Sequence, residues 1–355
     1  MNMAADKRLQ ELLDLVISQG GSDLHIASGA SPMVRVSGAL IPLTNYPAFA
    51  PEDTEAMLQS IVPPDRWDSF KKNQAIDLSY AHGAEARFRV NGYTVQGAVS
   101  LALRLIPHAT RTFAELNLPS ILEVFTQHKQ GFFLVVGPVG QGKSTTLATM
   151  IERINESRAE HILTIEDPVE YIFTPKQSLI HQREVYIDVP DFHSALQNSF
   201  REDVDVIMVG EMRDYETISS AVTAAETGHL VFSTLHTNNA AQTIDRIIDM
   251  FPAEQQGQVR VQLSGSLTGI FSQRLIPRIS GGLIPAIELL VNNNAVSTLI
   301  RDARTHELNS VIQTSSQEGM IDMDRSLAEL VRRGEVTVEH AYEHAMDPKT
   351  FESYL

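Results

Sequence analysis

The sequence predicts an α/β domain with a parallel sheet, preceded by a smaller α+β domain. From about residue 130 onward, short apolar stretches alternate with helical patterns, as a parallel α/β sheet requires. The first of these stretches, residues 131–136, runs into a glycine-rich loop and then into a helical pattern. Before residue 108, strand-like stretches follow one another with few helices between them. Two domains therefore fit a chain of 355 residues.

The first domain is predicted to span residues 1–108. Apolar residues at helical spacing predict a helix over residues 4–19, which the pair Gly20-Gly21 ends. A short helix is expected near residues 52–61. Strands are predicted at residues 22–26, 33–36, 75–80, 86–91 and 94–106.

Residues 109–118 have the proline and polar content of a linker. The α/β domain should then occupy residues 119–291, and residues 292–355 should form a helical extension of it. Its strands are predicted at 131–136, 161–165, 206–209, 230–233 and 285–290. Its helices are predicted at 119–129, 145–154, 190–200, 213–226, 239–249 and 252–271.

The loop Gly137-Pro138-Val139-Gly140-Gln141-Gly142-Lys143-Ser144-Thr145 fits the phosphate-binding pattern G-x-x-x-x-G-K-[ST]. Its glycines allow backbone N–H groups to face inward around phosphate oxygens. Lys143 can reach the β- and γ-phosphates, and the Ser144 hydroxyl is the expected Mg²⁺ ligand. A strand before the loop and a helix after it put the phosphates at a helix N-terminus. The sequence therefore predicts a site for ATP and Mg²⁺.

The composition argues against several other classes of protein. The formal net charge of −16 argues against a nucleic-acid surface, which needs clustered Lys and Arg. There are no cysteines, and so no disulfide, thiolate zinc site or Cys nucleophile is expected. No apolar run approaches the roughly 18–20 residues of a membrane-spanning helix. The expectation is a cytoplasmic protein that reaches a membrane only through a partner.

Acidic residues follow two of the predicted strands, at the edge of the sheet where α/β proteins bind ligands. Glu166, Asp167 and Glu170 flank Pro168 just after the strand at 161–165. They form either a solvated turn or a group that orients water near Mg²⁺, in which a glutamate acts as general base. Glu211 ends the strand at 206–209, and Gly210 stands where a second acid is usual. Glu211 is therefore expected to contact Mg²⁺ through a water molecule.

His229 and His236 bracket the strand at 230–233. They are either structural hydrogen-bonding groups or sensors of the γ-phosphate, and metal ligation is disfavoured because no third ligand accompanies them. In the first domain, Arg87 and Arg89 share one face of a strand, and Arg104 lies on the next strand. These arginines are either solvated or act as arginine fingers, in cis or in trans.

Several ordered motifs together resemble the type IV pilus retraction ATPases, the PilT-like twitching-motility members of the secretion-ATPase superfamily. They are GPVGQGKSTTLATMIERIN, HILTIEDPVEY, RFRVNGY and the segment from VDVIMVGEMRDYE to TNNAAQTIDRIIDMFP. The resemblance covers nearly the whole chain. It implies a PAS-like N-terminal domain joined to a RecA-like P-loop ATPase domain in a ring-shaped homohexamer. The ring would act at the inner membrane on a pilus platform protein, to retract the pilus by removing pilin.

The resemblance also implies roles for individual residues. Lys143 and Ser144 belong to its Walker A box, and Glu211 is its Walker B glutamate. Glu166, Asp167 and Glu170 form its Asp box, with Glu170 as the general base. His229 and His236 form its His box, and Arg87, Arg89 and Arg104 match arginines that approach the nucleotide at domain or subunit boundaries.

The sequence departs from the family pattern at a few positions. Val139 and Gln141 occupy variable positions of the Walker A loop and are expected to matter little, because backbone N–H groups make the contacts of that loop. Ser297 and Thr298 replace an Arg-Asn pair in a stretch that the family links to retraction. The alternative is therefore a nucleotide-gated scaffold or accessory paralogue, of the PilU kind, that regulates a sister pilus motor and hydrolyses little ATP itself.

Overall fold

The computed structural model describes residues 3–36, 38–83, 86–106 and 110–355. The chain forms two compact units, one of residues Met1–Ala109 with Asp167–Ile172, the other of Thr110–Glu166 with Phe173–Leu355. The predicted boundary between residues 108 and 109 lies outside the described residues. No helix in the described part of the chain is both long and apolar enough to cross a bilayer.

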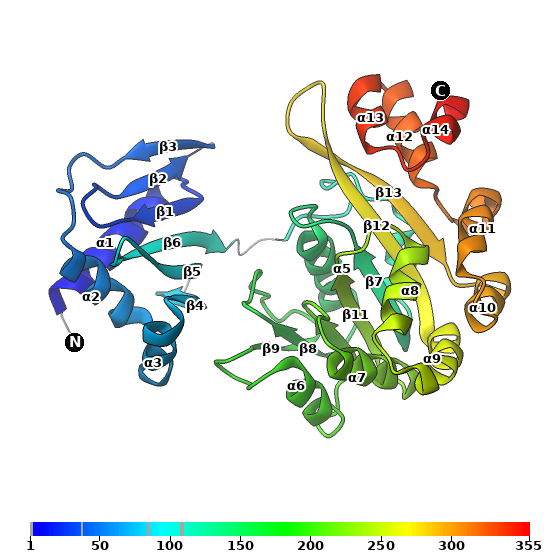
Figure 1. The fold of residues 1–355 in the computed structure, drawn as a ribbon, viewed down its shortest axis with the longest axis horizontal. Coiled ribbons are helices and arrows are strands. Elements are labelled where there is room, and N and C mark those ends of the chain that lie inside the picture. The colour runs from blue at the N-terminus through cyan, green and yellow to red at the C-terminus, as the bar shows by residue number, and fades with distance from the viewer. Residues whose placement is uncertain (1–2, 37, 84–85, 107–109) are drawn as a thin grey trace. The chain divides into compact units, whose positions relative to one another are not determined.

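The first unit is a six-stranded antiparallel sheet with three helices (Figure 1). The strand order is β3-β2-β1-β6-β5-β4. Leu9, Leu12 and Leu13 on α1 share one core with Phe88 and Leu101 of the sheet, as the helical spacing of those leucines requires. The elements are α1 (Met3–Ser18), β1 (Asp23–Ile26), β2 (Met33–Val36), β3 (Ala39–Pro42), α2 (Pro51–Ile61), α3 (Pro64–Asn73), β4 (Ala75–His82), β5 (Ala86–Val95) and β6 (Ala98–Ile106).

Two predictions for the first unit need correction. Strand β3 and helix α3 were not expected, because β3 is an exposed edge strand and α3 carries little apolar pattern. The strand predicted at 94–106 is divided, since β5 continues to Val95 and β6 begins at Ala98. Gln96 and Gly97, with φ of +51° and +82°, form the two-residue hairpin turn between them.

The second unit contains a seven-stranded sheet of order β13-β12-β7-β11-β10-β8-β9. All neighbouring pairs are parallel except β12 and β13. This is a RecA-like mixed sheet, and the predicted α/β class is correct. The strands are β7 (Gly131–Val136), β8 (His161–Glu166), β9 (Leu179–Glu184), β10 (Val206–Val209), β11 (Leu230–Leu235), β12 (Leu267–Pro277) and β13 (Leu283–Val291).

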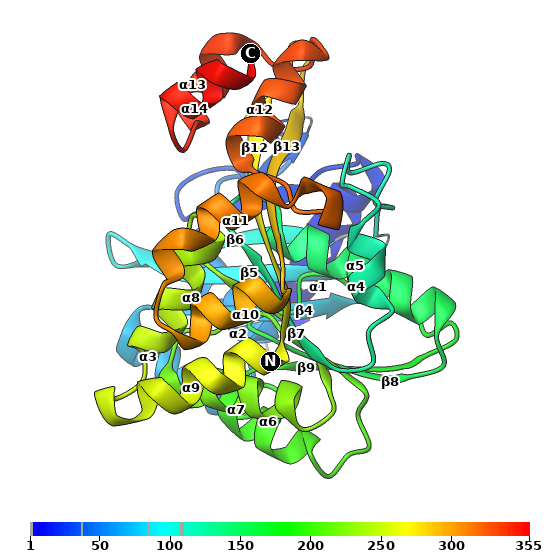
Figure 2. The same cartoon turned by 90° about the vertical axis from the view of Figure 1, so that its right-hand side faces the viewer.

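Helices cover this sheet and continue beyond it. Near the sheet lie α4 (Leu122–Thr126), α5 (Lys143–Ser157), α6 (Phe192–Ser199), α7 (Tyr215–Glu226), α8 (Ala240–Asp249) and α9 (Ala253–Ser266). After β13 follow α10 (Asn294–Arg301), α11 (Leu308–Thr314), α12 (Met323–Arg332), α13 (Val338–His344) and α14 (Pro348–Tyr354). Figures 1 and 2 show the last three gathered beside the long β12–β13 hairpin, with which they form a separate core.

The prediction of a helix through residue 271 is wrong, because α9 ends at Ser266 and β12 begins at the next residue. Buried residues on both faces of β12 hide the alternation that marks a half-buried strand. Gly269 permits the close packing, since a Cβ there would lie 2.8 Å from the ring of Phe125 and 2.9 Å from the carbonyl oxygen of Leu290. Strand β9 was also missed, and α4 is shorter than predicted.

Candidate nucleotide site

The phosphate-binding loop lies between β7 and α5, as its sequence predicts. Gly137 has φ of +146°, and a Cβ on it would lie 2.4 Å from the backbone oxygen of Gln273. Gly140 and Gly142 have φ near +80°, a region that L side chains seldom adopt. The loop conformation therefore requires glycines, and it leads into the N-terminus of a fifteen-residue helix. This is the backbone geometry that binds phosphate.

Three side chains meet at this loop: Lys143 from the start of α5, His236 from just after β11 and Glu211 from just after β10. Val136 pairs with Leu235, so Gly137 and His236 follow neighbouring strands at the same edge of the sheet. Lys143 Nζ donates to the carbonyl oxygens of Gly137 and Pro138, at 2.8 and 2.9 Å, and lies 3.0 Å from His236 Nδ1. His236 Nε2 in turn lies 3.0 Å from Glu211 Oε1.

This chain of contacts indicates the tautomer of His236. A charged Lys143 can only donate, so Nδ1 accepts and Nε2 carries the proton that is donated to Glu211. Burial raises the pKa of Glu211, but the hydrogen bond and charge of Arg213, with the nearby charge of Lys143, bring that pKa below its usual value. Glu211 is therefore ionised at neutral pH.

The described residues offer Mg²⁺ few free ligand atoms at this site. Both oxygens of Glu211 already have partners, because Oε2 accepts a hydrogen bond from Arg213 at 2.8 Å. Contact through a water molecule, which Mg²⁺ readily keeps, fits this arrangement. Ser144, the second residue of α5, supplies the hydroxyl donor beside the loop. The residues present thus fit Mg²⁺ with phosphate.

Glu166 lies at the end of β8, where it is 5% exposed. Thr164 donates to its Oε1 at 2.6 Å, and Gln182 Nε2 donates to the same atom at 3.3 Å. A Cβ at Gly210 would lie 3.5 Å from Glu166 Cα and 3.8 Å from its Cγ. Glu166 therefore places a carboxylate next to the position where the Walker B strand lacks its usual acid.

His229 lies far from the phosphate-binding loop in this chain. It precedes β11, whereas His236 follows it, and seven residues at about 3.3 Å each separate them by roughly 20 Å. Its Nδ1 contacts the carbonyl oxygen of Ala224 at 3.1 Å, and its ring packs edge-on against Phe200. Of the two alternatives predicted for His229, this position favours the structural hydrogen-bonding group, because a residue before a parallel strand reaches the edge opposite the loop.

The first unit contains Asp167, Glu170 and the three predicted arginines. Arg89 pairs directly with Arg104 across β5 and β6, and Arg87 lies two residues from Arg89 on the same face. Each arginine has a polar partner. Arg87 donates to Ser79, Arg104 donates to Asp23 at 2.8 Å, and Arg89 lies 3.6 Å from Glu170.

Sequence reasoning missed Gln273, a buried residue of β12 that supports the loop. Its Oε1 accepts from Thr146 at 2.7 Å, and its Nε2 donates to the carbonyl oxygen of Gln141. The Gln141 side chain also accepts from the backbone N–H of Leu275 at 2.6 Å. Gln141 was expected to matter little, and this is wrong, because its side chain ties the loop to β12. Val139, the other variable position of the loop, is 79% exposed.

Replacing Gln273 with alanine is expected to weaken ATP binding. The change removes a hydrogen bond to Gln141 in the loop and one to Thr146 at the start of α5. Together they are worth about 2 kcal/mol, or roughly a 30-fold rise in the Kd for ATP. Titration calorimetry measures it. Gln262→Ala is the control, since Gln262 contacts Glu226 on the surface. Equal affinity in both variants would show that Gln273 does not organise the loop.

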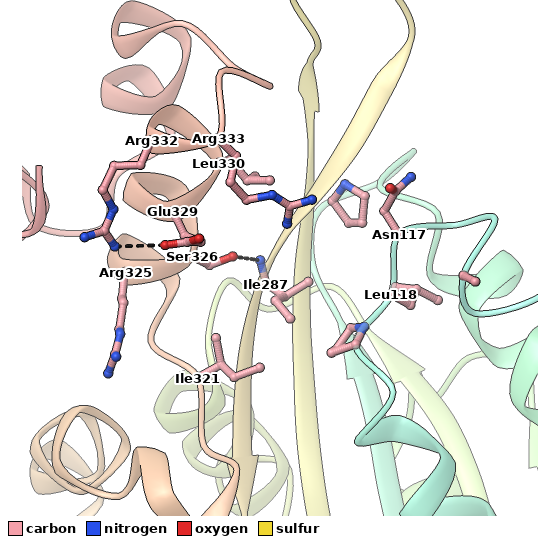
Figure 3. A pocket seen from close by; sticks show the side chains of 13 residues that line it. Asn117, Leu118, Ile287, Ile321, Arg325, Ser326, Glu329, Leu330, Arg332 and Arg333 are labelled. Atoms are coloured by element: carbon pink, nitrogen blue, oxygen red, sulfur yellow. Dashed lines mark hydrogen bonds and ion pairs between the residues drawn. The ribbon is translucent and has the colours of Figure 1, made fainter.

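A cavity of about 540 Å³ lies elsewhere in the second unit (Figure 3). Residues of segment 114–119, β13 and α12 line it, with Leu118, Ile287 and Leu330 among the apolar ones. The backbone N–H of Ile287 donates to Ser326 at 3.1 Å beside it. No residue of the phosphate-binding loop lines this cavity.

Comparison with known proteins agrees with this geometry. Residues 6–282 match the family model described as "Type II/IV secretion system protein". The chain is 42% identical over 343 residues to the type IV pilus ATPase PilT of Pseudomonas aeruginosa, covering 97% of this chain and 99% of that protein. It is 40% identical over 337 residues to the type IV pilus ATPase PilU of the same organism, covering 95% and 88%.

Solved structures give the same result. A crystal structure of the pilus retraction motor PilT with bound ADP superimposes with a TM-score of 0.89 at 44% identity, covering 97% of this chain and 98% of that one. The ATPase DotB of Legionella pneumophila superimposes with a TM-score of 0.86 at 26% identity, covering 95% of each chain.

Proposed function

We propose that this chain is a Mg²⁺-dependent motor that retracts type IV pili. It belongs to the family of type II/IV secretion system proteins and, within that family, to the PilT-type pilus ATPases. The observation that carries the proposal is the chain of contacts from Lys143 through His236 to Glu211 at a glycine-rich loop. It supports a site that senses the γ-phosphate and not merely one that holds a nucleotide.

ATP binding would use the loop, its helix and Lys143. Phosphate oxygens would replace the carbonyl oxygens and His236 as partners of the Lys143 ammonium, while backbone N–H groups from Gly140 to Thr145 surround the β-phosphate. Ser144 directly and Glu211 through water would hold Mg²⁺, which when bound supplies positive charge to the phosphates. His236, released from Lys143 but still oriented by Glu211, would then face the γ-phosphate.

Hydrolysis would require a base for the attacking water. We assign this role to Glu170, with Glu166 and Asp167 in the same acidic segment. Arg87, Arg89 and Arg104 would stabilise charge on the transferring phosphoryl group, which an arginine finger can do from the same subunit or a neighbouring one. The ion pair of Arg89 with Glu170 supports a functional link between base and arginines. His229 would have only a structural role, at the opposite end of β11.

The working assembly is proposed to be a homohexamer at the cytoplasmic face of the inner membrane. ATP binding and hydrolysis would rotate one domain layer against the other. That motion would act on the membrane platform protein and remove pilin subunits from the pilus base, which is the motion behind twitching. No nucleic acid or direct membrane insertion enters the proposal.

A second function, an accessory paralogue acting on a sister motor, is favoured by α10. Ser297 donates to the carbonyl oxygen of Ser264 at 2.9 Å, and Thr298 bonds back to Asn294 within its own helix. Neither residue presents the positive charge that an arginine would supply at this position. The similarity to PilU is also close to the similarity to PilT.

Complementation tests the proposal and separates its two forms. The chain is expressed in a host that lacks its own retraction ATPase, with or without the sister motor, and surface pili are counted. A principal motor should restore retraction and twitching without the sister motor, and Lys143→Ala should not. Restoration only with the sister motor would support the accessory form. No restoration in either host would contradict both.

A further inference from the structure

A buried carboxylate on β13, Glu288, contacts the N-terminus of α8 and has no part in the functions assigned above. Glu288 is 4% exposed. Its Oε1 accepts the backbone N–H of Ala240, the first residue of α8, at 2.8 Å, and the hydroxyl of Ser272 on β12 at 3.2 Å. An anion at a helix N-terminus is stabilised by the helix dipole and by the N–H groups that lack partners within the helix.

Ala240 ends the short connection that carries His236. Only residues 237–239 separate His236 from α8. Within that connection, Asn239 caps the helix by accepting from Gln242, and Thr237 bonds to Thr243 at 2.6 Å. The connection is therefore fixed at one end by Glu288 and at the other by the contacts of His236 with Lys143 and Glu211.

Strand β12 joins this arrangement to the phosphate-binding loop. Ser272 pairs with Glu288 on β13 and with Val136 at the end of β7. Gln273, the next residue, points to the opposite face because side chains alternate along a strand. It holds the loop through Thr146 and Gln141. One short piece of β12 thus supports both the loop and Glu288.

We propose that Glu288 is a positioning residue, which holds the N-terminus of α8 so that His236 stays aligned with Lys143 and Glu211. This inference rests on the proposed function for the role of His236. The carboxylate touches neither nucleotide nor water in the reaction and acts through the connection that it fixes. Its loss should let residues 236–240 move while the phosphate-binding loop stays in place.

Burial raises the pKa of Glu288 to about 7, against the opposing effects of the Ala240 and Ser272 hydrogen bonds. The charged groups that act on it are Asp322, before α12, and Arg274 on β12. Between pH 4.5 and 7 the folded protein keeps a proton that the unfolded chain has released, so stability falls as pH rises through this range. Glutamine does not titrate, so Glu288→Gln removes this dependence of stability on pH. The Tm of the wild type relative to the variant should therefore decrease from pH 5 to pH 8.

Two substitutions at Glu288 separate positioning from general stability. Glutamine keeps a side-chain oxygen that can accept hydrogen bonds from the Ala240 N–H and the Ser272 hydroxyl, whereas leucine has no such acceptor. Asp324 supplies the matched control, since it is also a buried carboxylate and accepts the backbone N–H groups of Met346 and Asp347 in the C-terminal region. Asp324→Leu should loosen that region and leave residues 236–243 as they are.

Hydrogen exchange of the nucleotide-free protein is the first readout. Glu288→Leu should speed exchange of the amides of residues 240–243 at least tenfold, with Glu288→Gln within threefold of wild type. Unchanged exchange in Glu288→Leu, or equal loosening there in Asp324→Leu, would overturn the inference. This readout does not depend on ATP hydrolysis, so it stands even if the proposed function fails.

Steady-state kinetics is the second readout. Glu288→Leu should lower kcat about 30-fold while the Kd for ADP stays within threefold, and Glu288→Gln should restore most of kcat. Equal loss of kcat in both variants, or a loss of ADP binding that matches the loss of kcat, would contradict positioning through the acceptor oxygen. A wild-type protein that binds ATP without turnover would instead count against the proposed motor.

Discussion

Replacing Lys143 with alanine is expected to abolish ATP turnover and to weaken ATP binding at least 100-fold. The Lys143 ammonium is buried among the carbonyl oxygens of Gly137 and Pro138 and the ring of His236. It is the positive charge within the loop that can pair with the β- and γ-phosphates. Its loss leaves the loop to bind a highly charged ligand through backbone N–H groups without a positive side chain of its own. Calorimetric titration with ATP and a phosphate-release assay measure the two effects.

Lys129→Ala is the control for that experiment, because Lys129 is an exposed lysine just before β7. It should bind and hydrolyse ATP as the wild type does. Thermal unfolding should show that both variants are folded. If Lys143→Ala retained wild-type affinity, the glycine-rich loop would not be the triphosphate site.

Replacing Glu170 with glutamine is expected to lower kcat at least 100-fold while the Kd for ATP stays within threefold. Glutamine has nearly the same shape but cannot take a proton from water at neutral pH, and general-base catalysis contributes typically 10²–10⁴-fold. Rapid-quench or phosphate-release kinetics measures kcat, and binding of a fluorescent ATP analogue measures affinity.

The same substitution at Glu254, an exposed glutamate at the start of α9, is the matched control and should change neither quantity. Glu211→Gln provides a further comparison. If Glu211→Gln abolished turnover and Glu170→Gln did not, the general base would be Glu211, and the contact of Glu170 with Arg89 would be structural.

The sequence predicts the parts of the site that local geometry determines. A glycine-rich loop between a buried strand and a helix has one backbone arrangement, so Gly137, Lys143 and Ser144 are recognisable without tertiary information. Parallel strands end at a common edge, which brings Glu211 and His236 together there. The same rule applied to His229 would have put it at the opposite edge, since it comes before its strand.

Residues that act across the sheet were less predictable. Gln273 and Glu288 lie on β12 and β13, and each has a partner more than 45 residues away in the sequence. A buried polar residue in an apolar stretch was the available signal, because such a residue needs a partner. In β12 that signal was not used, because residues 267–271 were assigned to a helix and no strand was predicted for residues 272–277. Gln141 was undervalued for a similar reason, since only the pairing of β12 beside β7 reveals its contact with Leu275.

The most direct test of a ring-shaped motor is phosphate release with Mg-ATP, measured over a range of protein concentrations beside Glu170→Gln. Light scattering on the same samples gives the oligomeric state. We expect turnover per subunit to rise as hexamers form and to be absent from Glu170→Gln hexamers, which still bind ATP. Hexamers of the wild type that bind ATP but release no phosphate at any concentration would contradict a ring-shaped motor.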